Sequence, residues 1–155
     1  MALVKHKQAL KEIFDAEMLH DGELDNLVDV VLPSSVSKLP STAEVFILLG
    51  NWTASDIRVG FMKAKYRLIN QELLIGAVSR DNPEGESVAE LNCFEASKKV
   101  RTILVNNRIL ASTSYPSGIA IESALTTSRI DYAIYEDILC CFDTIFLEMK
   151  VKEDL

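Results

Sequence analysis

Apolar and polar positions follow two different periods along this chain, and the change of period separates a helical beginning from a sheet-forming remainder. Over residues 5–20 apolar side chains recur every three or four positions, which predicts an amphipathic helix that Asp21-Gly22 ends. A second, shorter helix is predicted over 23–32, with leucines and valines on one side and aspartates on the other. Residues 1–32 are therefore interpreted as a helical arm.

The segment 33–42 follows the arm and is rich in serine and proline, which predicts a surface linker loop. From residue 43 the period shortens, and residues 43–155 are interpreted as an α+β core. A chain of 155 residues has the size of one ordinary domain, so arm, linker and core are expected to form one domain overall.

Several segments of the core have the length and composition of β-strands. Short apolar or alternating runs bounded by turn residues predict strands over 44–49, 72–80, 86–94 and 144–152. The turn composition of 81–85 predicts that the second and third of these strands form a hairpin.

Residues 57–69 fit two structures. As a strand they place Lys63, Lys65 and Arg67 on one face. As a helix they align Ile57 with Phe61, Ala64 and Leu68. Glycine at position 60 disfavours the helix, so a strand is predicted.

A further hairpin is predicted from 100–105 and 108–113, which flank Asn106-Asn107. Asparagine tolerates positive φ, so this pair suits a two-residue primed turn.

Apolar residues at helical spacing within 119–142, notably Ile130, Ile134, Ile138 and Cys141, predict a late helix, either one broken helix or two short ones. The fold class expected from all segments is α+β, a mainly antiparallel sheet with an N-terminal helical arm and a late helix.

Composition places the chain among globular proteins, with 48% hydrophobic and 25% charged residues. Its apolar runs, such as 45–49, are much shorter than the roughly 20 residues of a membrane-spanning helix, so no membrane span is predicted. Three cysteines leave one unpaired under any internal pairing, which favours free thiols in a reducing, intracellular compartment. We expect a cytoplasmic protein.

Residues with catalytic potential are few. The two histidines, His6 and His20, both fall in the predicted arm, where we expect them to be solvated. The adjacent Cys140 and Cys141 lack the spacing of a metal knuckle, and burial in a core segment is expected for both. No phosphate-binding or nucleophile motif occurs, so no catalytic residue, metal or cofactor is predicted.

Positive charge is concentrated in part of the core although the net charge is −7. Five residues form a candidate basic sheet face that could follow a nucleic-acid backbone, namely Lys63, Lys65, Arg67, Arg101 and Arg108. A solvated sheet face explains the same pattern and is the favoured interpretation.

The leading functional hypothesis is a non-enzymatic interaction or assembly protein that binds another protein, above all copies of itself. Four apolar arm residues are the candidate interface, namely Leu10, Ile13, Phe14 and Met18. A viral structural, matrix-like or accessory protein fits this description of size and composition. The first alternative is an accessory factor that binds RNA or another nucleic acid through the basic face. The second is a small enzyme with a carboxylate or thiol site.

Overall fold

The computed structural model describes residues 4–33, 44–58, 65–78, 85–135 and 138–152. Along these residues two helices and five strands follow one another: α1 (Lys5–Glu17), β1 (Val30–Leu32), β2 (Val45–Arg58), β3 (Lys65–Val78), α2 (Gly85–Val105), β4 (Glu122–Tyr135) and β5 (Ile138–Lys152). This set of helices and strands confirms the predicted fold class, an α+β fold with a mainly antiparallel sheet, an N-terminal helix and a later helix.

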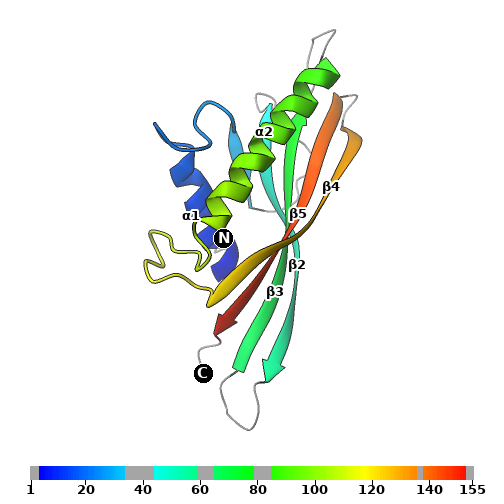
Figure 1. The fold of residues 1–155 in the computed structure, drawn as a ribbon. Helices are drawn as coiled ribbons and strands as arrows, with labels where there is room; N and C mark the ends of the chain where they lie inside the picture. Colours follow the sequence, from blue (N-terminus) through cyan, green and yellow to red (C-terminus); the bar gives the residue numbers. More distant parts are fainter. Residues whose placement is uncertain (1–3, 34–43, 59–64, 79–84, 136–137, 153–155) are drawn as a thin grey trace.

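The strands form one sheet in the order β1-β2-β3-β5-β4. β1 runs parallel to β2, and all the other neighbouring strands are antiparallel. β1 is short and pairs with residues 46–48 of β2, so the remainder of β2 lies at the edge of the described sheet. Figure 1 shows the sheet strongly twisted, with β2 and β3 continuing beyond the helices.

The sheet has one face covered by both helices and one face that no described helix covers (Figure 1). On the covered face, side chains of β2, β3 and β5 pack with those of α1 and α2, among them Ile47, Leu73 and Ile145. The opposite face carries a smaller apolar cluster that includes Phe46 and Cys140. Gly76 lies opposite Phe46, and a Cβ atom at position 76 would overlap the Phe46 ring, so only glycine leaves room for that ring.

The most consequential correction concerns residues 85–105, which form α2 and not parts of two hairpins. The buried positions Ala89, Cys93, Ala96 and Val100 are spaced three or four apart, as helix packing on a sheet requires. The predicted primed turn at Asn106-Asn107 is absent, because neither asparagine has a positive φ. The Asn107 amide group instead hydrogen-bonds both the N–H and the C=O of Ala111, at 2.9 Å each.

The second correction concerns residues 119–142, for which a late helix was predicted. They contribute β4 and the start of β5, two antiparallel strands that pair from Glu122–Lys150 to Tyr135–Ile138. The later helix of this fold is therefore α2, which precedes both strands. Pairing with β5 satisfies the β4 backbone groups that point toward β5 along almost the whole strand.

Two shorter predictions also require correction. The second arm helix is absent, since residues 19–27 form turns and residues 30–32 pair with β2 as a strand. The strand predicted over 57–69 is divided between the end of β2 and the start of β3. Arg58, the last residue of β2, lies opposite Lys65, the first residue of β3, in an antiparallel pair. Residues 59–64 lie outside the described part of the chain.

Three predicted strands are confirmed, since 44–49 falls within or beside β2, 72–78 within β3 and 144–152 within β5. The linker 34–42 and the turn 81–84 lie outside the described residues. Neither of the described helices is long and apolar enough to cross a membrane.

Candidate protein-interaction edge

Helix α2 runs along β4 in the opposite direction, and contacts at both ends fix this arrangement. Near the start of α2, the Tyr132 hydroxyl of β4 donates a hydrogen bond to Glu90, and this bond is the main reason that the pKa of Tyr132 is raised. Beyond the end of α2, Ser123 Oγ donates to the carbonyl oxygen of Arg108 at 2.7 Å. The helix and the strand therefore border one elongated surface.

Glu90, Phe94, Arg101 and Val105 occupy one row of α2, because their spacings of four, seven and four residues return to the same side of a helix. The contact of Glu90 with Tyr132 shows that this row faces β4. Phe94 and Val105 nevertheless remain exposed, at 46% and 51% of their surface. The row thus offers apolar surface to the solvent beside the strand.

β4 itself is an open edge of the sheet. It is hydrogen-bonded to β5 on one side, and among the described residues no strand pairs with its other side. Two of its large side chains on the helix face are exposed, Ile130 and Tyr132. We call this surface the α2–β4 edge and define it by Glu90, Phe94, Arg101, Val105 and the strand β4.

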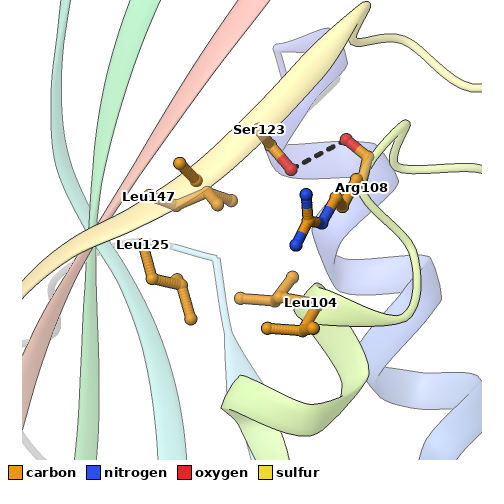
Figure 2. A pocket seen from close by; sticks show the side chains of 7 residues that line it. Leu104, Arg108, Ser123, Leu125 and Leu147 are labelled. Carbon is orange, nitrogen blue, oxygen red and sulfur yellow. Dashed lines mark hydrogen bonds between the residues drawn. The ribbon is translucent and has the colours of Figure 1, made fainter.

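A small pocket lies at the lower end of the α2–β4 edge, where α2 ends against the beginning of β4 (Figure 2). Its volume is about 270 Å³, which is slightly below the range typical of small-molecule sites. Leu104, Leu125 and Leu147 form its apolar wall, and Arg108 lies at its side (Figure 2). This lining suits the insertion of one apolar side chain from a partner protein.

The interior behind the edge contains a buried polar cluster. Asp143 of β5 is 4% exposed and accepts a hydrogen bond from the Ser97 hydroxyl of α2. The guanidinium of Arg101, which belongs to the α2 row, lies 3.7 Å from the same carboxylate. These contacts attach α2 to β5, because a buried carboxylate is costly unless it is paired and hydrogen-bonded.

The three thiols are buried, which confirms the expectation for Cys140 and Cys141. Burial, together with the neighbouring Cys141 and Asp143, raises the pKa of the Cys93 thiol, and Cys93 donates to the Ile75 carbonyl at 3.3 Å. Burial also raises the pKa of Cys141. Such thiols stay protonated near neutral pH and are poor nucleophiles. Within the described residues, no group of three or more His, Cys, Asp or Glu side chains could hold a metal ion.

The candidate basic face is not assembled as predicted. Lys63 lies outside the described residues, and Lys65 and Arg67 begin β3 at the end of the sheet beyond the helices. Arg101 lies on α2 beside Asp143, which is paired with Ile75 of β3. Ile75 is eight residues from Arg67, or about 26 Å along the strand, so Arg101 and Arg67 do not share a face. Arg101 and Arg108 share the α2–β4 edge, but on a helix and the loop after it, not on a hairpin.

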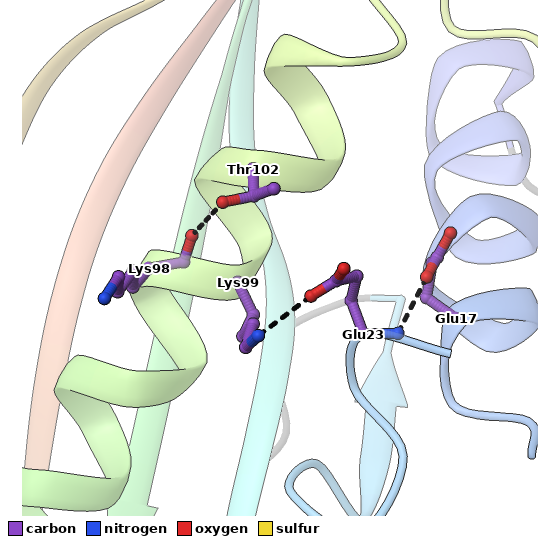
Figure 3. Close-up of polar contacts among 5 residues, drawn as sticks. All are labelled: Glu17, Glu23, Lys98, Lys99 and Thr102. Atoms are coloured by element: carbon purple, nitrogen blue, oxygen red, sulfur yellow. Dashed lines mark hydrogen bonds and ion pairs between the residues drawn. The ribbon is translucent and has the colours of Figure 1, made fainter. Parts of the chain in front are cut away.

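The candidate interface residues of the arm are occupied within the chain. Leu10, Ile13 and Phe14 are buried in the main core, and Met18 is half-buried against it. Figure 3 shows polar contacts that hold this region to α2: the Glu23 backbone N–H donates to Glu17, and Lys99 of α2 donates to the Glu23 carboxylate at 2.9 Å. While α1 is packed in this way, its apolar face is not available to a partner.

The expectation that both histidines are solvated is wrong for His6, although His20 is exposed. The His6 ring is 4% exposed and its Nε2 donates to Gln71 Oε1 at 3.0 Å. Trp52 packs edge-on against the ring, with centroids 4.8 Å apart. Because α1 packs across the sheet, a residue in its first turn reaches the centre of β3.

Sequence reasoning did not identify β4 or the exposed apolar residues of α2 as an interaction surface. One short signal was present, since residues 129–132 alternate between polar and apolar, as a half-exposed strand does. The edge position of that strand depends on the order of strands in the sheet, which no local pattern indicates.

Comparison with known proteins gives a match among solved structures. No family model matches the chain, and a search of curated proteins finds no match. Among solved structures, it is similar to a chain from the virion of a native gene transfer agent particle, with a TM-score of 0.62 at 11% sequence identity. The match covers 95% of this chain and 94% of that chain. At this identity the likeness establishes a shared fold over nearly the whole length of both chains.

Proposed function

We propose that this protein is a non-enzymatic structural subunit of a virus-like particle, which acts by binding other protein subunits, copies of itself included. The α2–β4 edge is the observation that carries the proposal, and the fold shared with a chain of a gene transfer agent virion supports it. The proposal also accounts for a surface that is expensive to expose in an isolated protein.

An open edge strand presents unpaired N–H and C=O groups, and proteins that function as monomers commonly shorten, charge or cover such edges. β4 is 14 residues long, against the five or six residues of a typical strand. Its apolar flank is formed by Phe94, Val105, Ile130 and Tyr132, and aromatic side chains such as those of Phe94 and Tyr132 are enriched at protein interfaces.

The interacting surface proposed from the structure is not the apolar face of the N-terminal helix that the sequence suggested. Since α1 contributes Leu10 and Phe14 to the main core, its apolar face serves the stability of the subunit. The partner-binding surface is instead the α2–β4 edge on the C-terminal side of the sheet.

We expect Phe94→Asp to weaken self-association by about tenfold or more, because large exposed aromatic side chains at the centre of an interface contribute the most to binding. Solution mass measured by light scattering over a range of protein concentrations, at low and high salt, checks this. The wild-type mass should rise above 17.3 kDa with concentration and should do so at both salt levels, as apolar contacts require.

Leu19→Asp is the matched control, because Leu19 is exposed at 68% in the turn after α1 and is not part of the α2–β4 edge. This control should associate like the wild type. A wild-type protein that stays monomeric at every concentration would contradict self-association, and equal effects of the two substitutions would contradict the role of the α2–β4 edge.

A further inference from the structure

The solvent-facing side of α2 indicates how two copies meet, and this inference rests on the proposed function. We propose that α2 packs against α2 of a second copy, antiparallel and about a two-fold axis, with Glu95 of each helix opposite Lys98 of the other. Since the helices cover one face of the sheet (Figure 1), the two sheets then lie on the outside of the pair.

Six residues form a line along the solvent-facing side of α2. Their spacing alternates between three and four residues, which keeps side chains on the side of a helix that packs against another helix. Lys98 follows the buried Ala89 by nine residues, or two and a half turns, so this line lies opposite the side that packs on the sheet. We call these six exposed residues the α2 stripe: Val88, Leu91, Glu95, Lys98, Thr102 and Val105.

The α2 stripe is complementary to itself in the antiparallel direction. With a two-fold axis at its middle, Val88 lies opposite Val105 of the second copy and Leu91 lies opposite Thr102, and each contact occurs twice. The apolar members expose 43%, 60% and 51% of their surface in the single chain, at Val88, Leu91 and Val105. Thr102 already donates its hydroxyl to the Lys98 carbonyl oxygen at 3.1 Å, so its methyl group can contact the second copy. Apolar contacts therefore form both ends of the interface.

Charge selects this direction and register. The axis between Glu95 and Lys98 sets these two residues opposite each other across the interface, and the symmetry repeats the ion pair once. The neighbouring antiparallel registers set Glu95 opposite an apolar residue, Leu91 or Val105, and leave its charge unpaired. A parallel pair in register sets Glu95 opposite Glu95 and Lys98 opposite Lys98, which adds like-charge repulsion.

The charges of Glu95 and Lys98 are available for these ion pairs. Both residues are exposed, and within the described part of the chain no ion pair involves either of them. Lys98 points away from α1, whereas its neighbour Lys99 pairs with Glu23 at 2.9 Å (Figure 3). Glu95 helps to raise the pKa of Lys99, but Glu23 is the main cause.

The α2 stripe is continuous with the α2–β4 edge, because Val105 belongs to both. Phe94 directly precedes Glu95 and lies on the flank of the stripe toward β4, so the second helix covers part of its exposed surface. Apolar contact at both ends, two central ion pairs and an aromatic flank then act at one interface. Substitutions that test this pair specifically must lie on the stripe and outside the α2–β4 edge.

Charge reversal at Glu95 and Lys98 meets this requirement. Glu95→Lys alone and Lys98→Glu alone each set like charges opposite one another at two places, and we expect each to weaken the dimer by about tenfold. The double variant E95K/K98E restores opposite charges and should associate within about threefold of the wild type. Sedimentation velocity over a concentration series measures all of these.

Two controls exclude a general effect of net charge. The two single variants change the net charge in opposite directions, so a general charge effect cannot weaken association in both. Glu44→Lys makes the same change in net charge as Glu95→Lys, at an exposed position before β2. This variant should associate like the wild type.

A disulfide gives a second readout of direction and register. The double variant V88C/V105C places thiols opposite each other between copies, and copper–phenanthroline should join them into a covalent dimer that reducing agent separates. Neither single variant should cross-link, because in the antiparallel pair the two copies of one position lie about 26 Å apart along the helices. The wild type is a further control, because its three native thiols are buried.

The outcomes separate this inference from the proposed function. If the wild type associates and both single reversals associate equally well, α2 pairing is overturned while self-assembly stands. If the double reversal stays dissociated although its circular dichroism is native, or if V88C/V105C does not cross-link, the register is overturned. Cross-linking of a single cysteine variant overturns the antiparallel direction. A wild-type protein that remains monomeric contradicts self-assembly, and the α2 pair with it.

Discussion

Replacing Phe14 with alanine is expected to lower the free energy of unfolding by about 3–5 kcal/mol, the usual cost of deleting a buried aromatic ring. Phe14 is fully buried where α1 packs on the sheet, in the same core as Leu73 and Ile145. The loss combines the transfer free energy of the ring with the cavity that it leaves. Urea unfolding followed by circular dichroism measures the change.

Val4→Ala is a suitable control, because Val4 is 42% exposed directly before α1, and its change should stay within about 0.5 kcal/mol. If Phe14→Ala were equally mild, α1 would be a detachable arm and the packing described above would not hold in solution. The same packing implies that a chain starting at Pro33 does not fold, since it lacks α1 and β1. Association experiments therefore need the full chain.

Acidification is expected to destabilise the protein through His6. Burial lowers the pKa of His6 from 6.5 to about 4, against the opposing effect of its hydrogen bond to Gln71. Between these two values the unfolded chain binds a proton that the folded protein excludes, so stability falls as the pH falls from about 6.5 to about 4. At 1.36 kcal/mol per pKa unit the loss approaches about 3 kcal/mol, and it is absent above pH 7.

Two variants isolate this effect in unfolding experiments at pH 7 and pH 4.5. His6→Gln removes the titrating ring and keeps an amide donor for Gln71 Oε1, so the His6 part of the pH dependence should disappear. His20→Gln is the matched control for replacing a histidine, because 91% of the His20 side chain is exposed. A wild-type pH dependence that survives His6→Gln would show that another group is responsible.

The elements that were predicted correctly from the sequence are those whose apolar pattern fits only one kind of secondary structure. Residues 144–152 alternate between apolar and polar except at Phe146, and 44–49 form a short apolar run; both are strands. The late helix failed because Ile130, Ile134 and Ile138 are spaced by four, and four is close to a helical turn and also twice the period of a strand. Such a spacing cannot separate the two structures by itself.

Helix α2 was missed for a different reason. Its buried face consists partly of small residues, including Ala89, Cys93 and Ala96, while Leu91 and Phe94 are exposed on other faces. This distribution conceals the apolar stripe by which an amphipathic helix is recognised. One of these exposed residues, Phe94, belongs to the α2–β4 edge that we propose for binding, so local pattern and function conflicted at that position.

The candidate site was only partly accessible from the sequence. Arg101 and Arg108 were identified as surface residues of interest, but for a hairpin that does not exist. The edge position of β4 follows from its pairing with β5 and from the insertion of β5 between β3 and β4, a non-local arrangement. Cys140 and Cys141 were correctly expected to be buried, because free cysteine is usually buried in any fold.

The strand order also has a consequence for biosynthesis. β3 lies at the centre of the sheet, and its partner β5 begins 60 residues after β3 ends, at Ile138 against Val78. A nascent chain on the ribosome therefore carries β2, β3 and α2 for several seconds before β5 can close the core. During that interval the side of β3 that later pairs with β5 is exposed. A chaperone that bound this strand would protect the chain from premature pairing with other nascent chains.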